Sequence, residues 1–445
     1  MTKRIYLPGR PAKISASSMW SWRRALRIPL AMFIATLCVH IASAQTALLN
    51  GTNADGTILA NTTNSYTLNA NSGDSINLRL GTTNFYGRLQ LYGPNGALLS
   101  TATDSTDDLI AYTATNSGTF TVLVSSSDYG GELAGTYALH LAQIPEAFIV
   151  PAGDEGGPMI NGGNYPGTIT LGDLDMWTFA ANTGDSINLR LGTTSFYGKL
   201  QLYGPNGALL STATDNTDDL IAYTATNSGT FTALVSSSDY GSLFTGTYVL
   251  SLAQMPEPFI VPPGDQGGGL NGSASYLGTI NLGDQDIWAF TACKGEVINL
   301  ALNTTNFYGK LQLYGSNGAL LKTAQNGMAL NIAYVATNCG TFTVLVSSSD
   351  YGSLYTGTYG LTAAGLSYEL RLCRPVITGA QLTLNGVGGD SGATFILYST
   401  TNVAKSFGLW TPVLTNQFDQ YGVLTYTNVY NPALRQQYFR FIEMK

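Results

Sequence analysis

A chain of 445 residues is too long for one small hydrophobic core, so several domains are expected. Only 11% of the residues are charged and 51 are glycine, a composition that favours strands and tight turns over solvent-exposed helices. The formal net charge of −7 argues against nucleic acid as a partner, because an acidic surface repels phosphate backbones.

Residues 1–44 have the pattern of a Sec-type signal peptide. Seven basic residues precede an apolar run, Ile28 to Ile41, and the small residues Ala42-Ser43-Ala44 follow it. The run is short for a bilayer crossing, so we expect secretion or display at the cell surface, with no membrane insertion after cleavage. An uncleaved anchor is the alternative, and translation can start at Met1 or Met19. Cleavage leaves 13 basic against 27 acidic residues, a balance that favours divalent cations as partners.

The next feature is a repeat with a fixed period of 111 residues. Phe85-Tyr86-Gly87 returns with this spacing at Phe196 and again at Phe307. A unit of this length matches an independent domain rather than a solenoid repeat. We therefore predict three domains, 45–143, 164–254 and 275–366, joined by linkers rich in Pro and Gly, 144–163 and 255–274, that are extended and flexible. Residues 372–445 break the period and predict a separate small β module.

Within each copy the apolar residues alternate with polar ones. In the first copy Ile76, Leu78 and Leu80 alternate with Asn77 and Arg79, and turn sequences rich in Asn and Gly separate such runs. One face of each strand should pack while the other is more polar. The predicted fold class is all-β: three tandem antiparallel, jelly-roll-like sandwiches and a small C-terminal β module.

The repeat resembles a known bacterial family. In the second copy the runs Gly172-Asp173-Leu174-Asp175-Met176-Trp177, Gly184-Asp185-Ser186-Ile187 and Leu200-Gln201-Leu202-Tyr203-Gly204 are similar to the bacterial pre-peptidase C-terminal domain. The resemblance covers about residues 50–365 and implies a jelly-roll-like accessory domain of secreted proteins, some relatives of which bind calcium. The segment from residue 372 is similar to C-terminal modules of large secreted proteins of Verrucomicrobia-type bacteria.

Histidine content argues against an enzyme. The chain has two His residues, and His40 lies in the signal peptide. His140 remains, and its equivalents in the other copies are Ser251 and Thr362, so we interpret it as structural. Nucleophile–histidine catalysis and His-ligated zinc are therefore poorly supported. A pair of carboxylates in a secreted hydrolase is the alternative, but no such pair stands out.

Repeated acidic residues make calcium the candidate cofactor. Two carboxylates flank the start of a strand in copies two and three, and the preceding linkers contribute further acids, which suits a cation that binds six to eight oxygens. The predicted ligands are Asp154, Asp173, Asp175, Asp265, Asp284 and Asp286, with Glu155 beside Asp154. The alternative is that these side chains shape turns through hydrogen bonds to the backbone. Copy one has Thr62 and Asn64 at the paired positions, so no site is expected there.

Two further groups of residues repeat with the same period. Tyrosines beside glycines in loops could contact sugars or a protein partner, with packing at the sandwich rim as the alternative; they are Tyr86, Tyr129, Tyr197, Tyr240, Tyr308 and Tyr351. Acidic residues in copies one and two are replaced in copy three and are interpreted as a solvated loop; they are Asp104, Asp107, Asp108, Asp215, Asp218 and Asp219.

Cysteines occur in the third copy and just beyond it. Cys293 and Cys339 replace residues of two turns and are predicted to form a disulfide, which would leave Cys373 buried, free or intermolecular.

Three functional hypotheses follow. The first is a secreted, non-catalytic protein that attaches to an extracellular polysaccharide or protein surface through repeated weak sites. The second is a calcium-stabilised structural spacer of the cell exterior. The third is a secreted hydrolase.

Overall fold

The computed structural model describes residues 45–444, except for residues 104, 130–132, 239–242, 271–274, 350–353, 367–368, 391, 420 and 430, and the side chains of 215 and 216. The predicted signal peptide therefore lies outside the described residues. Among the residues described, no helix combines the length and the hydropathy that a membrane crossing requires.

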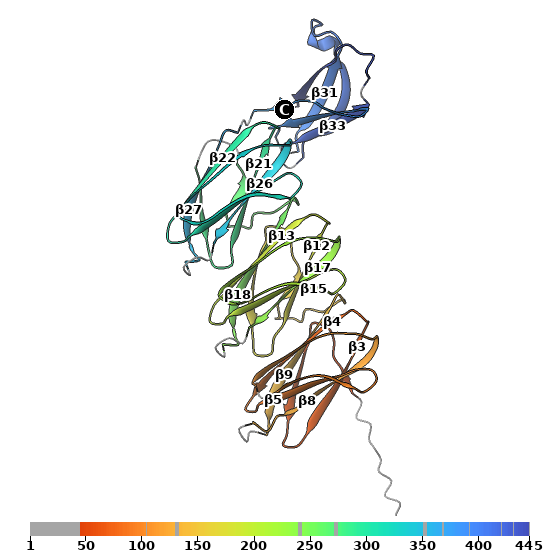
Figure 1. Ribbon diagram of the computed structural model, residues 1–445, viewed down its shortest axis with the longest axis vertical. Helices are drawn as coiled ribbons and strands as arrows, with labels where there is room; N and C mark the ends of the chain where they lie inside the picture. The colour runs from red at the N-terminus through yellow and green to blue at the C-terminus, as the bar shows by residue number, and fades with distance from the viewer. Residues whose placement is uncertain are drawn as a thin grey trace, which may run out of the picture. The chain divides into compact units, whose positions relative to one another are not determined.

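The first copy is a sandwich of two sheets, as predicted (Figure 1). The short strand β1 pairs in parallel with β3, and the other pairings are antiparallel. In spatial order the five-stranded sheet is β1 (Thr46–Ala47), β3 (Thr63–Ala70), β8 (Gly118–Ser126), β5 (Gly87–Tyr92) and β6 (Leu98–Thr103). The four-stranded sheet is β2 (Asn53–Ile58), β9 (Gly135–Ile144), β4 (Ser75–Thr83) and β7 (Asp107–Thr113).

The second copy repeats both sheets in the same order. Its five-stranded sheet is β10 (Gly156–Pro158), β12 (Asp175–Ala181), β17 (Gly229–Ser237), β14 (Gly198–Tyr203) and β15 (Leu209–Asn216). Its four-stranded sheet is β11 (Asn164–Ile169), β18 (Gly246–Met255), β13 (Ser186–Thr193) and β16 (Asp218–Thr224).

The third copy has the same arrangement. Its five-stranded sheet is β19 (Gly267–Gly269), β21 (Gln285–Ala292), β26 (Gly340–Ser348), β23 (Gly309–Tyr314) and β24 (Leu320–Gly327). Its four-stranded sheet is β20 (Ser275–Ile280), β27 (Gly357–Ala364), β22 (Val297–Thr304) and β25 (Ala329–Val335). If the eight long strands of a copy are counted from one to eight, the sheets read 2-7-4-5 and 1-8-3-6, which is the jelly-roll order.

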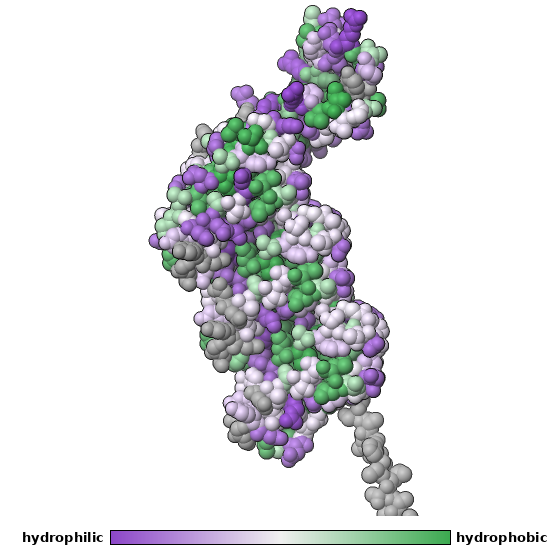
Figure 2. Space-filling view, in the orientation of Figure 1, coloured by the Kyte–Doolittle hydropathy of each residue, from purple (hydrophilic) through white to green (hydrophobic). Residues whose placement is uncertain are grey.

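Each sandwich has its own hydrophobic core between its sheets. The alternation seen in the sequence places Ile76, Leu78 and Leu80 of β4 in the first core, all with no exposed surface, against Phe120 and Val122 of β8. The other two copies bury the equivalent residues in separate clusters. At the surface, apolar residues are interspersed with polar ones on the face that Figure 2 shows.

The segments between the sandwiches differ from the flexible linkers that the composition predicts. Each contributes a short strand, β10 or β19, to the sheet of the following copy. The Asn50 side chain donates hydrogen bonds to the carbonyls of Gln143, Glu146 and Ala147, and Asn161 does the same one period later. These segments rich in Pro and Gly therefore form hydrogen-bonded connections, which the composition alone does not reveal.

The C-terminal module consists of two small sheets. One contains β28 (Arg371–Leu372), β30 (Gln381–Val387), β29 (Val376–Thr378) and β33 (Leu424–Val429), and the other β32 (Thr411–Gln417), β31 (Thr394–Thr400) and β34 (Tyr438–Glu443). A 3-10 turn spans Phe407–Leu409. The core between the sheets is centred on Leu384, Phe395, Leu397, Phe418 and Leu424.

Candidate metal sites at the junctions between repeats

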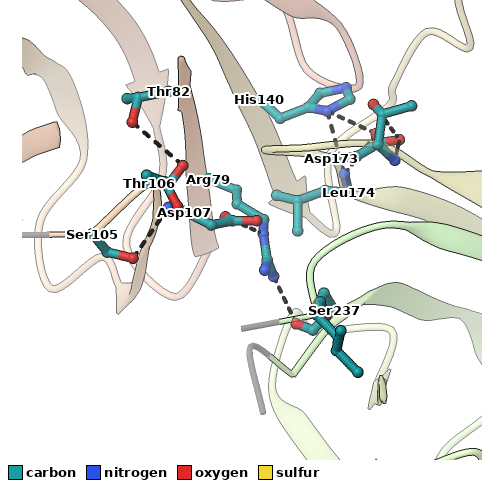
Figure 3. Close-up of polar contacts among 11 residues, drawn as sticks. Arg79, Thr82, Ser105, Thr106, Asp107, His140, Asp173, Leu174 and Ser237 are labelled. Atoms are coloured by element: carbon teal, nitrogen blue, oxygen red, sulfur yellow. Dashed lines mark hydrogen bonds and ion pairs between the residues drawn. The ribbon is translucent and has the colours of Figure 1, made fainter. Parts of the chain in front are cut away.

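Consecutive sandwiches meet through a buried ion pair. Arg79 of β4 and Asp107 of β7 have fully buried side chains, and Arg79 Nε lies 2.7 Å from Asp107 Oδ1 (Figure 3). Arg79 Nη1 also donates to the carbonyl oxygen of Ser237 in the second copy, at 2.8 Å. One period later Arg190 pairs with Asp218 at 2.7 Å and donates to Ser348 of the third copy. Charges that are buried this deeply have to be paired closely, because unpaired charges are costly in a low-dielectric interior.

This finding corrects the interpretation of the acidic residues as a solvated loop. Asp107 and Asp108 are 4% and 3% exposed. In copy three Ala301 replaces the arginine and Ala329 replaces the aspartate, so both partners are lost together. The third sandwich is followed by the C-terminal module rather than by another copy, so the pair is needed only at the two junctions between copies. Asp104 lies outside the described residues.

An apolar cluster and a close backbone contact complete each junction. At the first junction, side chains from β9 of copy one pack against copy two; the cluster contains Ala142, Ile144, Leu174, Met176, Tyr203 and Leu234. Its counterpart at the second junction contains Ala253, Met255, Ile287, Tyr314 and Leu345. A Cβ at Gly81 would lie 2.4 Å from the carbonyl carbon of Leu171, so only glycine fits there.

His140 also lies at the first junction. Its side chain is fully buried, and Nδ1 lies 3.0 Å from Asp173 Oδ1 (Figure 3). Nε2 lies 3.8 Å from Asp154 Oδ2. Burial alone would raise the pKa of Asp173, but the hydrogen bond and charge of His140 outweigh it and lower that pKa. At the second junction Ser251 takes the place of His140 and donates to the Gly283 carbonyl at 2.8 Å.

Beside His140 lies the first cluster of predicted metal ligands. Asp154, Glu155 and Asp175 each place a carboxylate oxygen within 4.8 Å of the others. Asp173 also lies beside this group, and its side chain accepts hydrogen bonds from the backbone N–H groups of Thr170 and Leu174. Asp173 therefore also shapes the turn through hydrogen bonds to the backbone, which is the alternative role that the sequence indicates for these acids.

Asp175 is the most deeply buried acid of this cluster. It is 1% exposed, and its Oδ2 accepts the hydroxyl hydrogen of Tyr248 at 2.5 Å, while its Oδ1 has no hydrogen-bond partner among the described residues. Burial, together with the negative charge of Asp173, raises the pKa of Asp175 to about 9. Without a cation this carboxyl is therefore neutral near pH 7; a bound cation would let it ionise.

The second cluster repeats this arrangement in copy three. Asp265, Asp284 and Asp286 place carboxylate oxygens within 4.8 Å of one another. Asp286 has no exposed surface, accepts the Tyr359 hydroxyl at 2.5 Å, and has an unpartnered Oδ1 among the described residues. Burial and the charge of Asp284 raise the pKa of Asp286 to about 9, and burial and Asp265 raise that of Asp284 to about 6. Asn164 of copy two donates to Asp265 at 2.8 Å, so this site adjoins the second junction.

Copy one shows what the same position becomes without carboxylates. Asn64 stands where the other copies have Asp175 and Asp286, and its Nδ2 donates to the Tyr137 hydroxyl at 2.8 Å. Tyr137 is the counterpart of Tyr248 and Tyr359. The polar atoms at this position are thus satisfied by neutral groups.

The donor set fits a hard divalent cation. Each cluster offers three or more carboxylates and at least one buried oxygen without a hydrogen-bond partner among the described residues, and calcium prefers oxygen ligands of this kind. Asp154, Glu155, Asp173 and Asp175 would hold the ion in copy two, and Asp265, Asp284 and Asp286 would hold it in copy three.

The repeated tyrosines form an edge contact in copy one. The rings of Tyr86 and Tyr129 meet edge to face with centroids 4.9 Å apart, and Tyr129 is 57% exposed. Tyr86, Tyr197 and Tyr308 are half-buried, and each accepts a backbone hydrogen bond from the adjacent loop. Tyr240 and Tyr351 lie outside the described residues. The first ring is therefore partly packed, and its partner Tyr129 presents the larger surface to solvent.

The predicted disulfide between Cys293 and Cys339 is wrong. Cys293 pairs with Cys373, with a Cα–Cα distance of 5.4 Å, and Cys339 is free and half-buried. The strand β28 carries Cys373 to the turn of Cys293, and an ion pair of 2.5 Å between Arg371 and Glu296 lies beside it. The pairing was missed because Cys373 lies outside the repeat and has no counterpart from which to infer its position.

Comparisons with known proteins add structural neighbours only. No family model matches the chain, and no curated protein matches it. Among solved structures, it is similar to the pre-peptidase C-terminal domain of a collagenase from Bacillus anthracis, at 19% identity, 22% of this chain, 95% of that one and a TM-score of 0.20. Another is the BSP domain of a biofilm-associated protein, at 8% identity, 90% and 95% coverage and a TM-score of 0.15. These likenesses concern β architecture and carry no functional argument.

Proposed function

We propose that this chain is a non-catalytic structural spacer of the cell exterior in which the second and third sandwiches each bind calcium beside a junction. The observation that carries the proposal is a buried carboxylate oxygen on each of Asp175 and Asp286 that has no hydrogen-bond partner in the described part of the chain. Each lies within a cluster of acids. A bound calcium ion would supply the positive counter-charge for these carboxylates.

The position of the acids explains why an ion would serve a spacer. Asp154 and Asp265 belong to the connections between sandwiches, whereas Asp175 and Asp286 are the first and second residues of strands in the following sandwich. An ion shared by these groups fastens each connection to the next domain. The buried Arg79–Asp107 and Arg190–Asp218 pairs then fix the neighbouring surfaces.

The test is thermal unfolding of the full chain in excess calcium and in chelator. The matched variants are Asp175→Asn and Asp286→Asn, which introduce the residue that copy one has at Asn64. With chelator each variant should be at least as stable as the wild type, because it removes a buried acid. With calcium each should be less stable, because a ligand is lost. Equal curves with calcium and chelator for the wild type would reject calcium binding.

Attachment is a second candidate, and exposed Tyr129 favours it. Its ring packs edge to face against that of Tyr86 and presents an exposed aromatic surface to a polysaccharide or protein. The tyrosines repeat with the 111-residue period, so weak sites could add through avidity. Replacement of Tyr129, Tyr240 and Tyr351 by Ala, singly and together, should reduce retention on polysaccharide or protein surfaces in steps while leaving the melting curve unchanged. Unchanged retention in the triple variant would reject this surface.

We also infer secretion through residues 1–44 and a family assignment. The repeated runs quoted above support three tandem pre-peptidase C-terminal type domains, and the segment from residue 372 supports a module of the Verrucomicrobia type. Amino-terminal sequencing of the exported protein tests the cleavage after Ala44.

A further inference from the structure

Three cysteines meet where the third sandwich joins the C-terminal module. The sulfur atoms of Cys293, Cys339 and Cys373 all lie within 4.8 Å of one another. Cys293 and Cys373 form the disulfide, and Cys339 is a half-buried thiol beside it. A thiol in contact distance of a disulfide is the starting arrangement for thiol–disulfide exchange.

The other two copies show what these positions do without sulfur. Asn71 and Asn182, the counterparts of Cys293, donate side-chain hydrogen bonds to Glu146 and Glu257 of the segments that follow their sandwiches. The turn is thus a fastening point for the next segment in every copy. In copy three the fastening is covalent.

The second turn in these copies carries a serine where copy three has Cys339. The hydroxyls of Ser117 and Ser228 accept the backbone N–H of Ser72 and Thr183, both at 2.9 Å. In copy three the N–H of Lys294 is directed at Cys339 Sγ, at 3.3 Å. Serine satisfies this donor equally well, so the cysteine adds only a nucleophilic sulfur.

We propose that Cys339 is an exchange-active thiol that attacks the Cys293–Cys373 disulfide and thereby switches the covalent fastening of the C-terminal module. The Cys339 thiolate forms a new S–S bond with one of the two sulfurs, and the other leaves as a thiolate and takes up a proton. One disulfide and one thiol are present before and after, so no oxidant or reductant is consumed.

The result of exchange depends on which sulfur leaves. Departure of Cys373 frees the module from the sandwich and leaves the Arg371–Glu296 ion pair as a non-covalent contact beside the former bond. Departure of Cys293 keeps the module attached through Cys339. The first outcome makes the fastening reversible, because the same exchange in the opposite direction restores the Cys293–Cys373 bond.

The test maps the thiols of the full native chain. The protein is incubated without reductant in mildly alkaline buffer, the exchange is quenched by an alkylating reagent before unfolding, and tryptic peptides are analysed by mass spectrometry. Lys294, Lys322 and Arg371 separate the three cysteines into different peptides. A disulfide that includes Cys339, with label on Cys373 or Cys293, is the expected result.

The matched control is Cys339→Ser, which gives copy three the residue of Ser117 and Ser228 and should leave the fold intact. In this variant the Cys293–Cys373 bond should remain the sole disulfide and no label should appear on either cysteine. Label confined to Cys339 in the wild-type chain, at every incubation time, would overturn the proposal. The same labelling pattern at Cys293 and Cys373 in both proteins would overturn it as well, because Cys339 would then have no part in it.

Discussion

Arg79 and Asp107 are ion-paired at 2.7 Å in the first sandwich, yet the guanidinium also binds a carbonyl of the second. The same three-part contact joins Arg190, Asp218 and Ser348. Each of these contacts therefore stabilises both the sandwich that contains the ion pair and the junction with the following sandwich.

Removal of one member of this pair should be costly. Asp107→Ala leaves a buried arginine without its counter-ion, and we expect a loss of about 3–5 kcal/mol in the free energy of unfolding of the first sandwich. The double variant Arg79→Ala/Asp107→Ala reproduces Ala301 and Ala329 of copy three, and should recover much of that loss. Chemical denaturation, followed by hydrogen exchange in β4 and β7, measures the loss in the single variant and the recovery in the double variant. If the double variant loses as much as the sum of the single ones, the two residues are not coupled.

The close backbone approach at Gly81 gives a second prediction. Gly81→Ala should separate the first and second sandwiches, because the new methyl group would meet the backbone of Leu171 and Gly172 at 2.4 and 2.5 Å. We expect a cost of about 1–3 kcal/mol and faster hydrogen exchange at Leu174 and Met176.

Copy three provides the control for that experiment. Its equivalent residue is Asn303, which is exposed and has no further copy against it. Asn303→Ala should change stability by less than about 0.5 kcal/mol. Equal effects of the two substitutions would show that Gly81 matters for its own strand rather than for the junction.

Sequence periodicity was sufficient for the sandwiches but not for their junctions. The alternation of Ile76, Leu78 and Leu80 predicts one buried face, and the structure confirms it. The junctions depend on polar residues such as Arg79, which alternation assigns to the outer face. The paired replacement by Ala301 and Ala329 was a usable signal, because residues that change together in one copy are expected to be in contact. Nothing comparable existed for Cys373.

His140 offers a third prediction, since it occurs at one junction only. His140→Ser introduces the residue that the second junction has at Ser251, but at the first junction it leaves Asp173 without its imidazole partner. We expect a loss of about 1–3 kcal/mol, with faster hydrogen exchange at Leu174. Ser251→Ala, which removes only neutral hydrogen bonds, to the Gly283 carbonyl and from the Gln285 amide, should cost less. Equal costs would mean that the imidazole fills space and that its contact with Asp173 contributes nothing to stability.

The raised pKa values of Asp175 and Asp286 predict how stability varies with pH in the absence of divalent cations. Both carboxyls have a pKa of about 9 in the folded chain against an ordinary value of 3.8. The folded state therefore holds protons that the unfolded state has released, and its stability should fall as pH rises from about 4 to about 9. Thermal unfolding in chelator at several pH values measures this fall.

Two comparisons separate this effect from the titration of other groups. The double variant Asp175→Asn/Asp286→Asn should show a flatter dependence over the same pH range, because it no longer contains these two buried acids. Excess calcium should also flatten the dependence in the wild-type chain, because the bound ion holds the carboxylates in their ionised form. A slope in chelator that the double variant retains in full would assign the pH dependence to other residues and remove the physical reason for a cation at these sites.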